Sequence, residues 1–195
     1  MDRIDGGAEA SIYECDIFGV KALAKVRQPK RYRVKILDDE LRKTRTRREA
    51  KVLALLMLKN VPVPAVLAVG EYVIFMEKLE GVLLRDADKG KEFYEKVGNV
   101  VRDMHNAGVA HGDMTTANII AVGNTPYVID LGLAEITVSV EEKALDILLM
   151  KRSLGESLYA KFLSGYSDRN INYKTVMNRL FDIEKRGRYQ VRTLQ

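Results

Sequence analysis

The sequence predicts an α+β fold with two lobes, in which a small antiparallel sheet and one long helix precede a mostly helical half. Short alternating apolar segments at residues 9–26, 65–69 and 72–76 are typical of strands with one buried face. Residues 38–59 form one long helical segment that ends at Asn60. Helical segments then dominate the end of the chain, at residues 140–152, 154–164 and 172–186.

The middle of the chain supplies a further helix and a hairpin. The helix ends at Gly108, and its apolar residues recur at helical spacing: Phe93, Val97, Val100 and Met104. The hairpin is expected from residues 119–122 and 127–129, joined by a turn at residues 123–126. This hairpin places a small piece of sheet within the helical half.

The composition fits one globular domain of 195 residues, because 47% of the residues are hydrophobic and 30% are charged. We expect an N-lobe at about residues 1–77, a C-lobe at about 78–185 and a basic tail at 186–195. Cys15 is the only cysteine, which excludes an internal disulfide framework and indicates a reducing, cytoplasmic location. Neither a secretory signal nor an apolar stretch long enough to span a bilayer is evident, so we expect no membrane association.

Positive charge is concentrated in two parts of the chain, whose net charge is +5. Residues 21–51 contain thirteen Lys and Arg against four acids, a local excess of +9. After Glu184 the chain carries only basic charges, at Lys185, Arg186, Arg188 and Arg192. Such clusters favour a phosphate-rich partner such as RNA, although a solvated helix face is the ordinary alternative for either cluster alone.

The motif with the clearest chemistry is the sequence HGDMTTAN at residues 111–118, followed twelve residues after Asn118 by Asp130-Leu131-Gly132. Phosphoryl transfer from ATP needs a carboxylate near the attacking oxygen and a divalent metal that bridges the phosphates. Asp113 on a loop would orient the acceptor, while Asn118 and Asp130 would hold Mg²⁺. Each of these residues alone is typical of a turn or cap, but the joint pattern favours chemistry. The glycine-rich motifs of P-loop and dinucleotide-binding proteins are absent from the sequence.

Such a phosphotransferase also needs a strand lysine at the phosphates, held by a helix glutamate. Lys25 lies in an apolar strand segment, and Glu49 lies at the edge of the apolar stripe of the long helix. An unpaired carboxylate at that edge would be costly, so we expect Lys25 to pair with Glu49. Two alternatives stay open: Lys21 as the strand lysine, and a surface pair between Arg45 and Glu49.

Three further features complete the expected site. A turn of small residues near the N-terminus would cover the phosphates, or is a plain turn; it consists of Gly6, Gly7, Ala8 and Glu9. Between the lobes, the backbone groups of Glu77 and Leu79 would meet adenine. Asp146, an acid within an apolar helical segment, would brace the backbone of residues 111–113, and simple surface exposure is the alternative.

The segment that protein kinases use to hold a peptide is nearly absent. Only about eight residues separate Gly132 from the helix expected near Val140, and no Ala-Pro-Glu sequence follows. Gly112 also stands where an arginine would receive an activation-loop phosphate. The sequence therefore predicts a minimal protein-kinase-like fold without an activation segment.

Several stretches together resemble the small atypical serine/threonine kinase of the KEOPS complex, also called the p53-related protein kinase family, in its archaeal form. The resemblance covers nearly the whole chain. It is carried by residues 7–10, 30–33, 37–38, 45–50, 111–118, 142–146 and 186–188. Two departures, Met114 for leucine and Leu131 for phenylalanine, are apolar replacements of similar size.

The resemblance implies an ATP- and Mg²⁺-dependent kinase or ATPase that supports formation of N6-threonylcarbamoyladenosine at position 37 of tRNA and phosphorylates itself on serine or threonine. The implied partners are a Kae-type tRNA threonylcarbamoyltransferase subunit, a small Cgi-type subunit and tRNA. By position, Asp113 matches the family's proton acceptor, Asn118 and Asp130 its metal ligands, and Lys25 and Glu49 its ATP-positioning pair. The basic residues that would face tRNA or a partner are Arg45, Arg47, Arg48, Arg186 and Arg188.

Two alternative functions remain open. A RIO-like or small-molecule kinase would also lack the peptide platform and can carry a His-Gly-Asp loop. A tRNA-binding scaffold without catalysis would need no complete metal site, whereas Asp113, Asn118 and Asp130 are all present.

Overall fold

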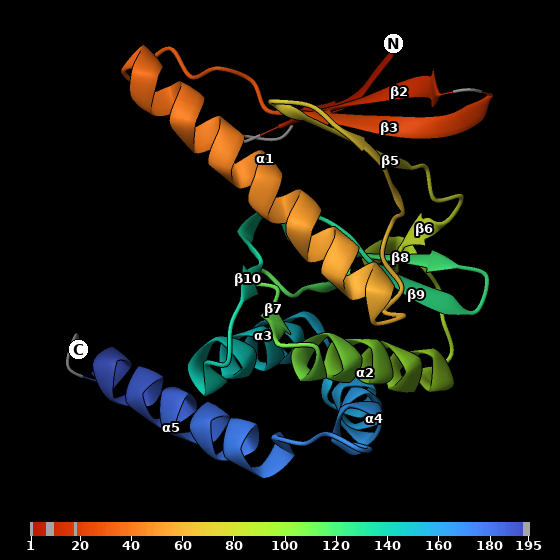
Figure 1. The fold of residues 1–195 in the computed structure, drawn as a ribbon. Helices are drawn as coiled ribbons and strands as arrows, with labels where there is room; N and C mark the ends of the chain where they lie inside the picture. Colours follow the sequence, from red (N-terminus) through yellow and green to blue (C-terminus); the bar gives the residue numbers. More distant parts are fainter. Residues whose placement is uncertain (1, 7–9, 18, 193–195) are drawn as a thin grey trace.

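The computed structural model of the chain describes residues 2–6, 10–17 and 19–192. It confirms the predicted α+β class: a small sheet with one long helix stands above a mostly helical part (Figure 1). The sheet is antiparallel throughout, with strand order β1-β2-β3-β5-β4. Its strands are β1 (Asp2–Gly6), β2 (Ser11–Ile17), β3 (Val20–Val26), β4 (Val66–Val69) and β5 (Val73–Glu77).

The long helix α1 (Lys35–Leu58) crosses beside this sheet and reaches down to the helical part (Figure 1). It begins one turn earlier than the expected start at residue 38, and Asp38 in its first turn complements the helix dipole. It ends at Leu58, and the predicted stop residue Asn60 follows; its φ of 56° is left-handed and lets the Val61 N–H bond to the Leu56 oxygen at 3.0 Å.

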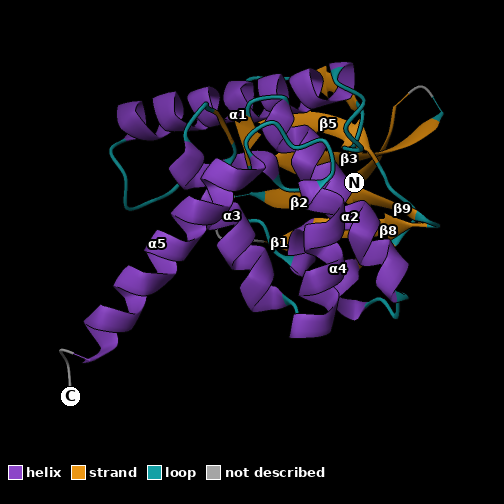
Figure 2. Cartoon of the chain, turned by 90° about the horizontal axis from the view of Figure 1, so that it is seen from below, coloured by secondary structure: helices purple, strands orange, loops and turns teal. Residues whose placement is uncertain are grey.

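The lower part is built from four helices and short strands, seen from below in Figure 2. The helices are α2 (Lys91–Asn106), α3 (Val140–Ser153), α4 (Glu156–Ser167) and α5 (Tyr173–Arg192). The backbones of α2 and α4 lie very close to each other where the two helices cross. A Cβ on Gly98 would overlap the Phe162 carbonyl, and one on Gly165 would overlap the Glu95 carbonyl, so glycine is required at both crossing points.

The hairpin of the lower part differs in one detail from the expected one. Its strands are β8 (Ile119–Val122) and β9 (Thr125–Val128), so the turn has only two residues, Gly123 and Asn124. Pro126 therefore belongs to a strand rather than to the turn. This is possible because β9 is an edge strand in the order β6-β8-β9, with β6 at Val82–Leu83, and an edge strand can lack one donor.

The chain that follows the hairpin is short and packed. After Asp130 come a 3₁₀ turn, η3 (Leu131–Leu133), and the strand β10 (Glu135–Ile136), and α3 begins at Val140 as expected. β10 pairs with β7 (Val109–Ala110), which leads directly into His111. One apolar core runs from the sheet into the helices and includes Leu56, Ile74, Met104 and Leu131. Within the described residues, no helix has both the length and the apolar character needed to cross a membrane.

Candidate active site

Lys25 and Glu49 meet at the centre of the molecule. Lys25, on β3, donates to Glu49 Oε1 at 2.5 Å and to Asp130 Oδ1 at 2.7 Å. Arg27, just beyond β3, donates to the other oxygen of the Glu49 carboxylate at 2.6 Å. Glu49 is only 2% exposed, so it is a buried partner of two cations rather than half of a surface pair with a neighbour on its helix. Lys21, the alternative strand lysine, is exposed.

These contacts keep the groups of the cluster charged. Burial works against the charged form of Lys25, but the carboxylates of Glu49 and Asp130 outweigh it and raise the pKa of Lys25. Burial also works against the charged form of Asp130 and by itself would raise the pKa of this carboxyl group. The charge of Lys25, its hydrogen bond and a backbone bond from Gly132 lower the pKa of Asp130 below its usual value. An ionised Asp130 is therefore ready to bind a cation at neutral pH.

The loop after β7 holds Asp113 and Asn118 together. Asn118 is the last residue of a 3₁₀ turn, η2 (Thr116–Asn118), and its Nδ2 donates to the Asp113 backbone oxygen at 2.7 Å and to Asp113 Oδ2 at 3.0 Å. Because the NH₂ group makes both bonds, the opposite atom Oδ1 is the one that can meet a metal ion. Asp113 is exposed, so the predicted role of orienting an acceptor is compatible with its position.

His111 is a structural residue of this loop. It is fully buried, its Nε2 lies 3.0 Å from the Ile129 carbonyl oxygen, and its Nδ1 lies 3.2 Å from the Asp113 backbone N–H. A carbonyl accepts and an N–H donates, so Nε2 carries the proton and Nδ1 accepts. His111 thereby connects this loop, the predicted catalytic loop at residues 111–118, to the strand that leads to Asp130. Neither ring nitrogen is available as a base.

Asp146 on α3 braces the loop, as the sequence predicted. It is fully buried, and its two oxygens accept hydrogen bonds from the His111 N–H at 2.6 Å and the Gly112 N–H at 2.9 Å. His105 is also part of this network, although its place near the end of a helix suggested only a favourable contact with the helix dipole. It lies 3.1 Å from Asp146 through Nε2 and 2.8 Å from the Tyr166 hydroxyl through Nδ1. Burial lowers the pKa of His105 although Asp146 acts in the opposite direction, so its imidazole is neutral.

Asp130, predicted as a metal ligand, has a strained backbone conformation. Asp130 has φ 54° and ψ 62°, a left-handed conformation that is uncommon outside glycine and asparagine. Gly132 follows, and a Cβ there would lie 3.3 Å from Asp130 Oδ1 and 3.4 Å from Arg27 Nη2. A side chain at Gly132 would thus press on the charged cluster. Strain held in place by packing is typical of functional positions.

A cavity of about 370 Å³ lies between the sheet and the helical part. Lys25, Glu49, Asn118 and Asp130 all line it, so the structure brings these four predicted residues to one cavity. The predicted adenine-binding residues also line it, at Glu77 and Leu79. The apolar lining, which sequence analysis did not identify, includes Ile12, Leu23, Met76, Leu83, Ile120, Ile129 and Leu131. Its size and mixed lining suit a small ligand with an apolar ring and a charged end.

Arg85 is a further residue of this cavity that sequence analysis missed. It lies in the 3₁₀ turn η1 (Leu84–Asp86) and lines the same cavity as Asn118. Its only hydrogen-bonded carboxylate within the described residues is its exposed neighbour Asp86, at 3.3 Å. Such an exposed pair is weak, so the guanidinium can turn to an anionic ligand. An arginine that follows a short apolar segment has no sequence spacing that would mark it as a ligand-binding residue.

The other predicted residues fall in different places. Gly6 is the last residue of β1, while Gly7, Ala8 and Glu9 lie outside the described residues. Arg47 is exposed on α1, whereas Arg45 is half-buried and Arg48 bonds to the chain after Asp130. Arg186 is an exposed residue of α5; Arg188 belongs to the same helix, and its side chain lies outside the described residues.

A magnesium ion fits the donors that the cavity offers. Asn118 and Asp130 supply an amide oxygen and a carboxylate, which are the ligands that Mg²⁺ prefers. Across the described ranges there is no group of three or more His, Cys, Asp or Glu side chains that could hold a metal. Mg²⁺ that is also bound by phosphates takes only one or two carboxylate-type ligands from the protein, so this pair is sufficient.

Comparison with known proteins agrees with this geometry. The family model described as RIO domain matches residues 19–151. The chain is 36% identical to a probable serine/threonine-protein kinase BUD32 homolog of Archaeoglobus fulgidus, over 95% of this chain and 94% of the relative. It is 33% identical to the KEOPS complex subunit Bud32 of Pyrococcus abyssi, over 99% of this chain and 98% of that protein.

Longer relatives match as well. A probable bifunctional tRNA threonylcarbamoyladenosine biosynthesis protein of Methanosarcina acetivorans is 36% identical over 96% of this chain. The match covers 36% of that protein, so the chain spans about a third of the length of the first curated relatives. Among solved structures, the Rio2 kinase-ADP/Mg²⁺-phosphoaspartate complex from Chaetomium thermophilum superposes with a TM-score of 0.69 at 16% identity, over 97% of this chain and 71% of that one. At that identity the likeness establishes the fold alone.

Proposed function

Because the chain belongs to the RIO domain family, and to the Bud32 family of the relatives that it matches over nearly their whole length, we propose that it cleaves ATP with the help of Mg²⁺. The phosphoryl group is transferred to water or to a serine or threonine. The observation that carries the proposal is a chain of ion pairs. It runs from Arg27 through Glu49 and Lys25 to Asp130, and it ends in a cavity that Asn118 also lines.

The residues of the cavity divide the task among them. Lys25 would meet the α- and β-phosphates, oriented by Glu49 from the buried side. Asn118 and Asp130 would hold Mg²⁺, which neutralises the charge of the phosphates. Asp113 would orient the attacking hydroxyl and accept its proton, because it is exposed and held by Asn118.

The nucleotide itself would be held from two sides. We assign adenine binding to the backbone groups of Glu77 and Leu79 at the cavity edge. Covering of the phosphates would fall to Gly6, Gly7, Ala8 and Glu9, of which only Gly6 is among the described residues. Among the apolar residues of the cavity, Leu23 and Ile129 would exclude water around the base and strengthen the electrostatic contacts.

The wider role that we propose is in tRNA modification. Full-length relatives are named as KEOPS complex subunits, and longer ones as tRNA threonylcarbamoyladenosine biosynthesis proteins. We infer that ATP cleavage by this chain supports the same modification, in a cytoplasmic complex with a Kae-type transferase subunit and a small Cgi-type subunit. The excess of +9 over residues 21–51 and the basic end of the chain support contact with tRNA.

The test is the Mg²⁺-dependent turnover of γ-labelled ATP, alone and with tRNA and the transferase partner, with free phosphate resolved from phosphoprotein. Free phosphate that rises with the partners and disappears in Asp130→Ala supports the proposal. Asp113→Asn should lower turnover while nucleotide binding is retained. If the label were found only on protein, in an amount that does not depend on tRNA, the chain would act as a protein kinase and the proposed role in tRNA modification would fail. Intact tRNA modification with Asp130→Ala would indicate a non-catalytic scaffold.

A further inference from the structure

The position after His111 is crowded by the segment that follows Asp130. Gly112 has φ +81°, and a Cβ there would lie 2.8 Å from the Leu133 carbonyl oxygen. Any larger residue would be both strained and too close to that backbone. The fold therefore cannot use an arginine of the catalytic loop to hold this segment.

An arginine of α1 holds it instead. Arg48 Nε donates to the Ala134 carbonyl oxygen at 2.9 Å, and Arg48 Nη2 lies 3.4 Å from the Leu133 oxygen. The same Nη2 donates to Glu135 Oε1 at 2.9 Å. One guanidinium thus contacts three consecutive residues through its fixed fork of donors, which a lysine does not have.

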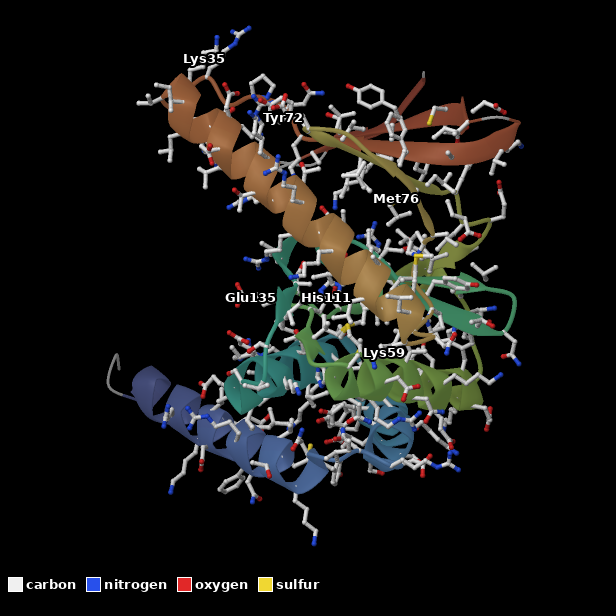
Figure 3. All side chains as sticks on the ribbon, in the orientation of Figure 1. Lys35, Lys59, Tyr72, Met76, His111 and Glu135 are labelled. Atoms are coloured by element: carbon white, nitrogen blue, oxygen red, sulfur yellow. The ribbon has the colours of Figure 1, made fainter. Side chains whose placement is uncertain are left out.

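The place of Arg48 on its helix connects the two halves of the active site. Its neighbour Glu49 binds Lys25 on the sheet side, while Arg48 binds the segment after Asp130. That segment continues into β10, whose residue Glu135 pairs with Ala110 immediately before the catalytic loop. Figure 3 labels Glu135 and His111, which lie close to each other beside the middle of α1. A shift of this segment would therefore be transmitted to Asp130 at one end and to residues 111–113 at the other.

We propose that Arg48 is a positioning residue for the proposed phosphoryl transfer. It fixes residues 131–136 against α1 and so holds Asp130 and the catalytic loop in the productive arrangement without phosphorylation of the segment. This inference rests on the proposed function for its kinetic consequences, but the ordering of the segment is independent of it. Arg48 therefore binds residues of its own chain, whereas the sequence alone predicted that it faces tRNA or a partner.

The effect of losing these bonds is moderate because the side chain of Arg48 is 44% exposed. Charge-assisted hydrogen bonds contribute most when they are buried, and exposure weakens them. We expect Arg48→Gln to lower the turnover number about tenfold and to raise the Mg²⁺ concentration needed for half-maximal activity. The KM for ATP should stay within about twofold, since Arg48 does not line the nucleotide cavity.

The test compares Arg48→Gln with Lys51→Gln, which removes the same charge from an exposed lysine of the same helix. Hydrogen exchange of the nucleotide-free chain should become faster in peptides covering residues 131–137 for Arg48→Gln only, while urea unfolding shows that both variants are still folded. The turnover and Mg²⁺ dependence should change in the same variant. Arg48→Lys, which keeps the charge but loses the fork, should not restore the wild-type values.

Equal exchange of residues 131–137 in Arg48→Gln and Lys51→Gln would overturn the inference, as would equal turnover numbers. If the wild-type chain itself showed no Mg²⁺-dependent turnover, the proposed function would fail. The exchange experiment would still decide whether Arg48 orders the segment, so the two failures are distinguishable.

Discussion

Replacing Glu49 by glutamine is expected to lower the free energy of unfolding by about 3 kcal/mol. Glu49 is 2% exposed, and its two carboxylate oxygens meet Lys25 Nζ at 2.5 Å and Arg27 Nη2 at 2.6 Å. Glutamine has nearly the same volume, so the loss is electrostatic and not a matter of packing. Breaking a buried ion pair by removing one partner costs roughly 3–5 kcal/mol. The lower end applies here because the amide oxygen still accepts one bond and Asp130 still faces Lys25.

Urea unfolding followed by circular dichroism measures this loss, and thermal unfolding measures it independently. For a chain of this size about 1 kcal/mol shifts Tm by 2–4 °C, so Tm should fall by roughly 6–12 °C. The matched control is Glu40→Gln, an exposed glutamate of the same helix, whose effect should stay below about 0.5 kcal/mol. A loss in Glu49→Gln no larger than in the control would refute the reasoning.

Three other changes test separate parts of the structure. Gly98→Ala should lower the free energy of unfolding by about 2–3 kcal/mol, because its Cβ meets the Phe162 carbonyl and forces α2 away from α4. For His105, whose pKa burial lowers, the unfolded chain takes up the proton first as the pH falls below the usual value of 6.5. Stability is therefore lost on acidification below that pH, by at most about 1.4 kcal/mol per pH unit, and the urea midpoints of His105→Asn should lack this part of the slope. Arg85→Gln should weaken ADP binding about three- to tenfold in titration calorimetry and leave adenosine binding unchanged, because the lost contact is to phosphate.

Controls exist for each of these changes. Gly155→Ala adds a methyl group where nothing lies within 4 Å, so its cost is limited to that of alanine at the N-cap of α4, about 1 kcal/mol or less. Lys89→Gln removes a nearby half-buried charge that bonds to the Gly123 carbonyl and does not line the cavity. Equal effects of Gly98→Ala and Gly155→Ala, or of Arg85→Gln and Lys89→Gln, would contradict the respective explanation. An unchanged acid slope in His105→Asn would mean that another group carries the proton.

The fold was largely predictable because local signals agree with the final contacts. The alternation of apolar residues placed the strands, and Asn60 marked the end of the long helix through its left-handed conformation. The placement of the residues predicted to carry catalysis and metal binding was predictable for a related reason. Asp113, Asn118 and Asp130 flank one hairpin, so their spacing along the chain already brings them to one end of it.

The remaining residues depend on contacts between distant parts of the chain. Arg27 is an ordinary cation in a basic stretch until the fold sets it against the far side of Glu49, and Arg48 becomes a segment anchor only because Ala134 passes beside α1. The excess of basic residues over residues 21–51 predicted an external partner for these side chains. In the structure, Lys25, Arg27 and Arg48 instead bind groups of the same chain. Pro126 was assigned to a turn because its place on an edge strand is not encoded locally.

Calorimetric titration of ADP into the chain, with and without Mg²⁺, tests directly whether the cavity is an ATP site with Mg²⁺ held at Asn118 and Asp130. We expect Mg²⁺ to strengthen ADP binding to the wild type and to Asp113→Asn, because Asp113 would meet the acceptor and not the nucleotide. Asp130→Ala should lose the effect of Mg²⁺ while its urea midpoint shows that the chain is folded. ADP binding that is indifferent to Mg²⁺ in the wild type, or equally dependent on it in Asp130→Ala, would show that these residues do not hold Mg²⁺ at a nucleotide.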